Sequence, residues 1–153
     1  MRMQQMQAQL ESAVMDDDAL GAWRAFLNAH AQVTRRIGRD LADAGLPDLT
    51  WYDLLWAVYR RPLRVNELAR AVVLSATAMS RFVDRVEAAG YVRREPDPAD
   101  RRALQITITE AGADLLRRMW PIYSRGIEEH FSAHLDDPAR TRAALERIAE
   151  SAR

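Results

Sequence analysis

The chain has 153 residues, which is enough for one domain with a sizeable hydrophobic core. Its 22 basic and 22 acidic residues cancel, so the protein as a whole has no general attraction for polyanions. The absence of cysteine excludes a disulfide framework, a thiolate metal site and a thiol redox switch. Residues 1–9 are polar, without the hydrophobic region of a signal peptide, and no long apolar run follows, so we expect a cytoplasmic protein.

The distribution of charge is more informative than the sum. Residues 60–102 contain ten arginines against six acidic residues, an excess of four positive charges, and the remainder of the chain carries the opposite excess. A basic region in mid-chain can bind the phosphates of a nucleic-acid duplex while the acidic remainder of the chain stays away from that duplex.

The first long element is a helix that follows Asp16, Asp17 and Asp18, because acidic residues favour a helix N-terminus. Residues 1–13 before it are rich in Gln and Met and predict a frayed or weak helical extension. Gly45 and Pro47 end the helix after about 25 residues, or roughly 35–40 Å. A helix so long in a small protein is expected to pack against more than its own chain. Its apolar seam is Leu20, Trp23, Leu27, His30, Thr34, Ile37 and Leu41.

The next helix is predicted from a Thr50 cap, with Asp53 three residues on, to Arg60, where Pro62 closes it. It is apolar almost all round and should be central. The residues responsible are Trp51, Tyr52, Leu54, Leu55, Trp56, Val58 and Tyr59.

Two short helices follow a brief extended piece at residues 63–65. Asn66 is predicted to cap the first, which runs through Val72, and only Val73 and Leu74 remain for the turn. Ser75 caps the second, which ends before Gly90, a residue type suited to the left-handed end of a helix. Its buried stripe is Met79, Phe82, Val83 and Val86.

The outer face of this second helix is short-chained near its start and carries arginine beyond. A recognition helix reads base edges mainly through its N-terminal turns, so small residues permit close approach and Arg81 can reach a guanine. A plain amphipathic surface helix is the alternative interpretation. The outward residues are Thr77, Ser80, Arg81, Asp84, Arg85 and Ala88.

A hairpin is predicted after Gly90. Residues 91–94 form one strand, the alternation of Leu104, Ile106 and Ile108 gives the second, and residues 95–102 form a polar, proline-rich loop. Arg101 and Arg102 end this loop, and arginine on a stiff projection suits the negative potential of the minor groove. The alternative is a surface ion pair worth little.

Two helices complete the chain. The first opens at Thr109, and Pro121 and Gly126 inside it predict a kink near Trp120 or two shorter helices. The second starts at Asp137-Pro138 and runs to about Ala152 with only a thin apolar side, so pairing with a second chain would anchor it. The first helix presents Leu115, Leu116, Met119, Ile122, Ile127, Phe131 and Leu135, and the second presents Leu145 and Ile148.

From Leu49 to Gly112, and more loosely over nearly the whole chain, the sequence resembles the MarR family of bacterial transcription regulators. Each matching piece is common, but their order and spacing together are specific. The pieces are Leu49-Thr50, Glu67-Leu68-Ala69, Leu74-Ser75-Ala76-Thr77-Ala78-Met79-Ser80-Arg81, Val83-Asp84-Arg85-Val86-Glu87, Gly90-Tyr91-Val92-Arg93-Arg94, Asp97-Pro98, Asp100-Arg101-Arg102 and Thr109-Glu110-Ala111-Gly112.

The resemblance implies a mainly α fold with a small β-hairpin wing, as one domain over residues 1–153. Residues 49–109 would be the winged helix-turn-helix, and residues 14–48 and 110–153 would dimerise. A homodimer would bind a pseudo-palindromic operator on double-stranded DNA. Asp100 would brace the wing. In the turn between the two short helices, this sequence has Val73 where many relatives have glycine. The expected DNA contacts are Ser75, Thr77, Ala78, Ser80, Arg81, Arg85, Arg93, Arg94, Asp100, Arg101 and Arg102.

A small aromatic effector is also expected, because helices that contribute Tyr, Trp and His can line a cavity with a polar element. Core packing is the alternative for each residue. The candidate set is Trp23, His30, Trp51, Tyr52, Trp56, Tyr59, Met119, Trp120 and Tyr123.

Three classes of function stay open, and the first is a DNA-binding regulator, with repression expected. The second is a winged-helix module for protein contacts, in which the arginines of the wing would be surplus. The third is a metal-dependent enzyme or zinc sensor that uses His130 and His134, four apart on one helix beside Glu129. We expect neither an enzyme nor a cofactor, because no nucleophile–base–acid set or phosphate loop is present, and two surface histidines are the simpler interpretation.

Overall fold

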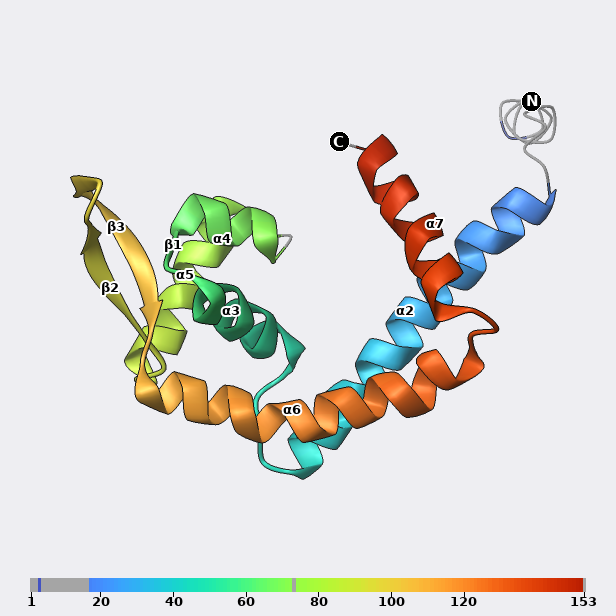
Figure 1. Cartoon of the computed structure of the whole chain (residues 1–153), viewed down its shortest axis with the longest axis horizontal. Coiled ribbons are helices and arrows are strands. Elements are labelled where there is room, and N and C mark those ends of the chain that lie inside the picture. The colour runs from blue at the N-terminus through green and yellow to red at the C-terminus, as the bar shows by residue number, and fades with distance from the viewer. Residues whose placement is uncertain (1–2, 4–16, 73, 153) are drawn as a thin grey trace.

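The computed structural model describes residue 3, residues 17–72 and residues 74–152. Figure 1 shows a lobe of short helices and a small sheet at one end, with α6 running from this lobe to the other end, where α2 and α7 lie. The predictions for residues 1–13, Asp16 and Val73 fall outside the described residues. The elements are α2 (Asp17–Asp43), α3 (Leu49–Arg60), β1 (Leu63–Arg64), α4 (Val65–Ala71), α5 (Ala76–Ala88), β2 (Val92–Asp97), β3 (Asp100–Ile108), α6 (Glu110–His130), the 3-10 turn η1 (Ser132–His134) and α7 (Pro138–Ser151).

The long helix α2 spans 27 residues, or about 40 Å, as its apolar seam predicts. Asp17 and Asp18 lie in its first turn, where their charge favours the positive end of the helix dipole. Gly45 follows the helix with a φ of +68°, a conformation that glycine adopts without steric cost. The predicted end of the helix is therefore confirmed.

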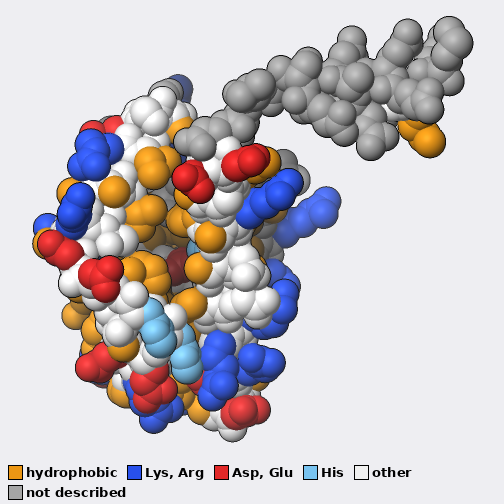
Figure 2. Space-filling view, turned by 90° about the vertical axis from the view of Figure 1, so that its right-hand side faces the viewer, with side chains coloured by type: hydrophobic (Ala, Val, Ile, Leu, Met, Phe, Trp, Pro, Cys, Tyr) orange, Lys and Arg blue, Asp and Glu red, His pale blue; other side chains and the backbone are white. Residues whose placement is uncertain are grey.

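Among the described residues of α2, the buried ones lie in its C-terminal half. Ile37 and Leu41 are buried, and this half packs on α6. Trp23, Phe26 and Leu27 in the other half are 55%, 46% and 45% exposed. Figure 2 views this end of the molecule and shows hydrophobic side chains along a hollow. The seam thus extends beyond anything that the described part of the chain covers.

The capping residue of α3 is Asp48, so the prediction of Thr50 is wrong. The Asp48 carboxylate accepts the Thr50 N–H at 2.9 Å, and Asp48 has the extended backbone that a cap requires. The helix is central on one face only, because Trp56 and Tyr59 are about half exposed. Its buried face is Tyr52, Leu54, Leu55 and Val58.

The helix-turn-helix consists of α4 and α5. Asn66 does not cap α4: the helix begins at Val65, and the Glu67 carboxylate accepts the Arg64 N–H at 2.8 Å. For α5 the prediction is confirmed, because the Ser75 hydroxyl accepts the Ala78 N–H at 3.2 Å and Gly90 follows with a φ of +84°. The stripe predicted to be buried is buried: Met79, Phe82, Val83 and Val86.

The wing belongs to a three-stranded antiparallel sheet in the order β1-β3-β2, to which the extended piece at Leu63 contributes β1. The predicted eight-residue loop is wrong, because most of it lies in β2 and β3 and only Pro98 and Ala99 lie between the strands. Pro96 fits into β2 because that strand is at an edge, where a missing N–H removes no central ladder bond. The wing is therefore a longer ribbon than expected.

The helix α6 runs uninterrupted through Pro121, so the prediction of two shorter helices is wrong. Its N-cap is Thr109, as predicted, with the hydroxyl accepting the Gly112 N–H at 3.1 Å. Close packing against α2 holds the helix together beyond the proline: a Cβ at Gly126 would lie 2.5 Å from Cγ1 of Ile37. Tertiary contacts here outweigh the hydrogen bond that the proline removes.

The terminal helix α7 begins as predicted, with Asp137 accepting the Arg140 N–H at 3.0 Å and Pro138 in the first turn. None of its described residues is buried, and Ile148 is 62% exposed. A cavity of about 320 Å³ lies between α2 and α7, with Phe26, His30 and Leu145 among its lining residues. Among the described helices, none has both the length and the apolar composition to cross a membrane.

Candidate nucleic-acid interface

The outer face of α5 is positioned by its buried stripe. Thr77, Arg81 and Asp84 are exposed on the side opposite to the core, and Ser80 is half-buried at the margin. The guanidinium carbon of Arg85 lies 5.1 Å from the centre of the Phe82 ring, a cation–π contact that holds the arginine against its own helix. The face therefore begins with short side chains and continues with arginine, as predicted.

Arg101 and Arg102 lie at the beginning of β3 and are exposed. Asp100 accepts the Arg102 N–H at 3.1 Å through one carboxylate oxygen, which fixes the turn of the chain into β3. Within the described part of the chain, Arg81, Arg101 and Arg102 take part in none of the ion pairs. No carboxylate among the described residues therefore neutralises these three positive charges.

Arg94 is held differently from these three side chains. Its guanidinium pairs with Asp84 at 2.6 Å and also with Glu87, and its backbone N–H donates to Glu87 at 2.9 Å. These contacts join β2 to α5, the second helix of the helix-turn-helix. Arg93 pairs with Glu95 on the same strand. The two arginines that the sequence predicts as DNA contacts on β2 are therefore engaged with carboxylates.

Sequence reasoning missed Arg64, which reaches the wing from β1. Its guanidinium donates to Asp97 at 2.8 Å and lies 3.9 Å from Asp100. The pKa of Asp97 is lowered, first by the Ala99 N–H and then by Arg64. The two partners are 33 residues apart, so no local sequence signal joins them.

A cavity of about 320 Å³ lies between α3 and α6. Tyr52, Trp56 and Tyr59 stack in series along α3, with ring centres 6.4 and 6.1 Å apart, and Tyr52 also stacks on Trp120 at 6.3 Å. Burial raises the pKa of Tyr52 to about 12, helped by Tyr123 and Asp53. The lining residues are Tyr52, Trp56, Tyr59, Ala113, Leu116, Arg117 and Trp120.

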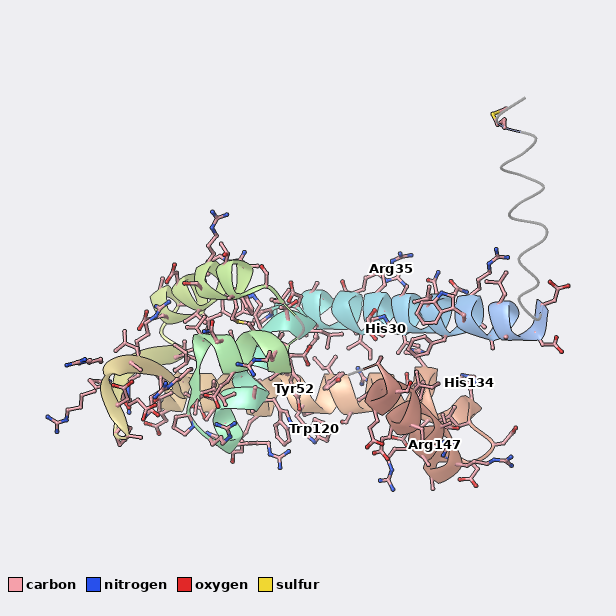
Figure 3. The ribbon with its side chains drawn as sticks, turned by 90° about the horizontal axis from the view of Figure 1, so that it is seen from above. His30, Arg35, Tyr52, Trp120, His134 and Arg147 are labelled. Atoms are coloured by element: carbon pink, nitrogen blue, oxygen red, sulfur yellow. The ribbon has the colours of Figure 1, made fainter. Side chains whose placement is uncertain are left out.

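The remaining aromatic candidates lie elsewhere. Figure 3 shows Tyr52 and Trp120 close together, and His30 farther along α2. Trp51 instead packs edge-on against Phe82 at 5.8 Å, in the core beneath α5. Trp23 stacks on Phe26, which lines the cavity between α2 and α7 together with His30. Met119 is fully buried, and Tyr123 packs on Tyr52.

The two histidines do not share a helix. His130 is the last residue of α6 and His134 lies in η1, so the predicted spacing on one helical face is wrong. Glu129 lies 3.9 Å from Nε2 of His130. No group of three or more His, Cys, Asp or Glu side chains within the described residues could hold a metal ion.

Residues 44–103 match the MarR family. AbsC, a MarR family transcriptional regulator from Streptomyces coelicolor, aligns with a TM-score of 0.81 at 30% identity, covering 92% of this chain and 97% of AbsC. The chain belongs to the MarR family. HosA, a transcriptional regulator of Escherichia coli O111:H-, is 33% identical over 93 residues, which cover 59% of this chain and 68% of HosA. Sco3205, a MarR family regulator from Streptomyces coelicolor, was solved in complex with DNA; it aligns with a TM-score of 0.77 at 29% identity, covering 91% of this chain and 89% of Sco3205.

The chain is thus a DNA-binding transcriptional regulator of the MarR family. This confirms the predicted family, fold class and function as a DNA-binding regulator. The family is one of regulators and not of enzymes, as the sequence analysis expected.

Proposed function

We propose that the protein is a homodimeric repressor of a pseudo-palindromic operator. Each subunit places α5 in a major groove and the tip of the wing in the adjacent minor groove. The observation that carries this proposal is the contrast among the arginines of the lobe: Arg81, Arg101 and Arg102 are exposed outside the ion pairs, whereas Arg64, Arg93 and Arg94 face carboxylates. Arginines outside ion pairs on α5 and at the wing tip fit one contact in the major groove and one in the minor groove.

In the major groove, Ser75, Thr77, Ala78 and Ser80 allow α5 to approach the base edges, and Arg81 then donates to a guanine. Arg85, held on the Phe82 ring, contacts a phosphate. Arg93 and Arg94 serve mainly to hold the wing, because their carboxylate partners already satisfy them.

The proposed dimer uses the end of the molecule that holds α2 and α7, within residues 14–48 and 110–153. A single chain exposes Trp23, Phe26 and Leu27 along α2 and Ile148 on α7, which is more large apolar surface than one helix pair of a monomer usually leaves in water. A two-fold axis there sets two recognition helices about one turn of B-DNA apart, ~34 Å. A bound dimer occupies both half-sites and excludes other proteins from the same grooves, which is the simplest form of repression.

A small aromatic ligand is proposed to bind between α3 and α6. The stacked rings of Tyr52, Trp56 and Trp120 offer a planar apolar surface, and Arg117 at the margin offers a positive charge for an acidic group. Such a ligand releases the operator only if it binds unequally to the two arrangements of the lobes. Because α6 extends from this cavity towards α2, a change at Trp120 can alter the lobe spacing.

Selection of bound sequences from random DNA, at stated salt, tests the DNA-reading part. An inverted repeat is expected, and Arg81→Ala should lose about 1–3 kcal/mol on that repeat and relax preference at one position. Arg85→Ala is the matched control, since a phosphate contact weakens binding on all sequences alike. Absence of any enriched sequence would instead favour a winged-helix module for protein contacts.

Sedimentation of the protein with and without the Trp23→Ala and Phe26→Ala pair tests the dimer. The pair should shift the equilibrium towards monomer, and Leu104→Ala, at an equally exposed leucine on the wing, should not.

Titration of aromatic acids, followed by tryptophan fluorescence and operator release, tests the effector. Quenching without any change in DNA affinity would contradict that part of the proposal.

A further inference from the structure

The wing is a two-stranded ribbon whose tip projects beyond the third strand. β1 contributes only Leu63 and Arg64, which pair with Ile106 and Gln105 of β3. Beyond this register, no third strand of the described chain pairs with the ribbon. A ribbon of two strands is weakly fixed by its backbone alone, so side chains must set the direction of its tip.

Arg64 is aimed at this ribbon by its own backbone. Leu63 turns into the core and is 6% exposed, so Arg64 points to the other face of the sheet. The Arg64 N–H is held by Glu67 at the start of α4 at 2.8 Å. The guanidinium then donates from Nε to one Asp97 oxygen at 2.8 Å, and one of its terminal nitrogens lies 2.7 Å from the same oxygen.

Asp97 lies where the pairing of the two wing strands becomes irregular. The register of β2 and β3 shifts between Pro96 and Asp97, and the second Asp97 oxygen accepts the Ala99 N–H at 2.8 Å in the tip turn. The Asp97 side chain is only 16% exposed. One carboxylate thus joins the tip of the wing to Arg64 and, through β1, to the start of α4.

We propose that Arg64 is a positioning residue that sets the direction of the wing tip and so delivers Arg101 and Arg102 to the minor groove. This inference rests on the proposed function of the wing. Asp100 lies 3.9 Å from Arg64 and immediately precedes Arg101. The contacts of Arg64 with the wing therefore end one residue before the proposed minor-groove contact. Arg64 itself acts through Asp97 and does not touch DNA.

A direct phosphate contact is the competing role for Arg64. Arg61, Arg64 and Arg70 all line a polar cavity of about 540 Å³ between β1, α4 and the wing. Arg70 is the matched control, because its guanidinium donates to the Asn66 carbonyl at 3.3 Å within its own helix and holds no part of the wing. General attraction for DNA would depend on Arg64 and Arg70 alike.

The test measures operator affinity, its salt dependence and the melting temperature for a set of full-length variants. We expect Arg64→Ala to weaken operator binding about two- to fivefold, the range of one partly exposed ion pair, with Arg64→Lys intermediate and Arg70→Ala unchanged. In a background in which Arg101 and Arg102 are both alanine, adding Arg64→Ala should alter neither affinity nor salt slope, because the tip has no contact left to lose.

Several outcomes overturn the inference. Additive losses in that background, or a further decrease of the salt slope by about 1, would make Arg64 a phosphate contact. Equal losses from Arg64→Ala and Arg70→Ala would indicate general electrostatics. If the Arg101 and Arg102 background itself binds the operator as well as the parent does, the wing's part in the proposed function fails, which is a different result from a failure of Arg64 alone.

Discussion

Gly112 lies in the first turn of α6, where one added methyl group should push this helix away from the base of the wing. A Cβ there would overlap the Tyr91 carbonyl oxygen, far inside 3.0 Å, and would lie 2.8 Å from Cγ1 of Ile108. The Tyr91 carbonyl cannot retreat freely, because it accepts the Thr109 N–H at 3.1 Å. The Thr109 hydroxyl in turn donates to the Gly90 carbonyl at 2.7 Å.

The size of the effect follows from these contacts. Real Cβ atoms essentially never approach a neighbour within 3.0 Å, so α6 must move by several tenths of an ångström or more. Overpacking costs about 1–3 kcal/mol, and loosening the Thr109 cap adds about 1. The better helix propensity of alanine returns about 1 kcal/mol. We expect Gly112→Ala to lower the free energy of unfolding by about 1–3 kcal/mol, or roughly 3–10 °C in Tm.

Urea unfolding of the parent and of Gly112→Ala, at one fixed protein concentration, measures the difference in the free energy of unfolding. Gly38→Ala is the matched control, because a Cβ at this helical position of α2 meets nothing within 4 Å. That variant should gain about 0.5–1 kcal/mol. If Gly112→Ala were as stable as Gly38→Ala, the close approach of α6 to the Tyr91 carbonyl would be wrong.

Three other perturbations follow from single contacts. Arg94→Ala removes the guanidinium from the Glu87 carboxylate and leaves it only the backbone N–H of residue 94, so denaturant unfolding should show a loss of about 1–3 kcal/mol, which an unchanged midpoint would refute. Burial raises the pKa of Tyr52 from 10.0 to about 12, so its contribution to stability is fully present below pH 10 and is lost as pH rises towards 12. Unfolding between pH 9 and 12 should therefore show a steeper fall for the parent than for Tyr52→Phe, and parallel curves would contradict it. The three atoms nearest to a Cβ at Gly126 all belong to the Ile37 side chain and not to backbone, so Gly126→Ala should lose less stability than Gly112→Ala, whose Cβ overlaps a backbone carbonyl, in the same assay.

The sequence predicted most elements because each helix carries its own signals. The buried stripe of α5, the Ser75 cap and the Gly90 stop are local, so no tertiary information was needed. The cap predictions failed where acceptors compete within two residues. Asp48 and Thr50 are both good caps by composition, and only the backbone conformation after Pro47 decides between them.

The candidate site was predicted less well because its organisation depends on contacts between distant residues. Arg94 looks like an exposed strand arginine in the sequence, and its pairing with Asp84 becomes visible only when β2 lies against α5. The aromatic set could have been divided from sequence alone. Tyr52, Trp56 and Tyr59 are spaced i, i+4 and i+7 on one helical face, and Trp51 falls outside that spacing.

In the proposed mechanism, regulation of this lobe acts through its attachments, because the outer face of α5 and the wing tip consist of short side chains and of arginines outside the ion pairs of the described residues. α6 begins at the base of the wing, passes the cavity at Trp120 and packs against Ile37 of α2 through Gly126. Since the helix is unbroken across Pro121, a ligand that displaces Trp120 moves α6 as one piece. In the proposed dimer, a small rotation of α6 would carry the whole lobe with it, and two recognition helices that must match a spacing of ~34 Å would tolerate little of that rotation.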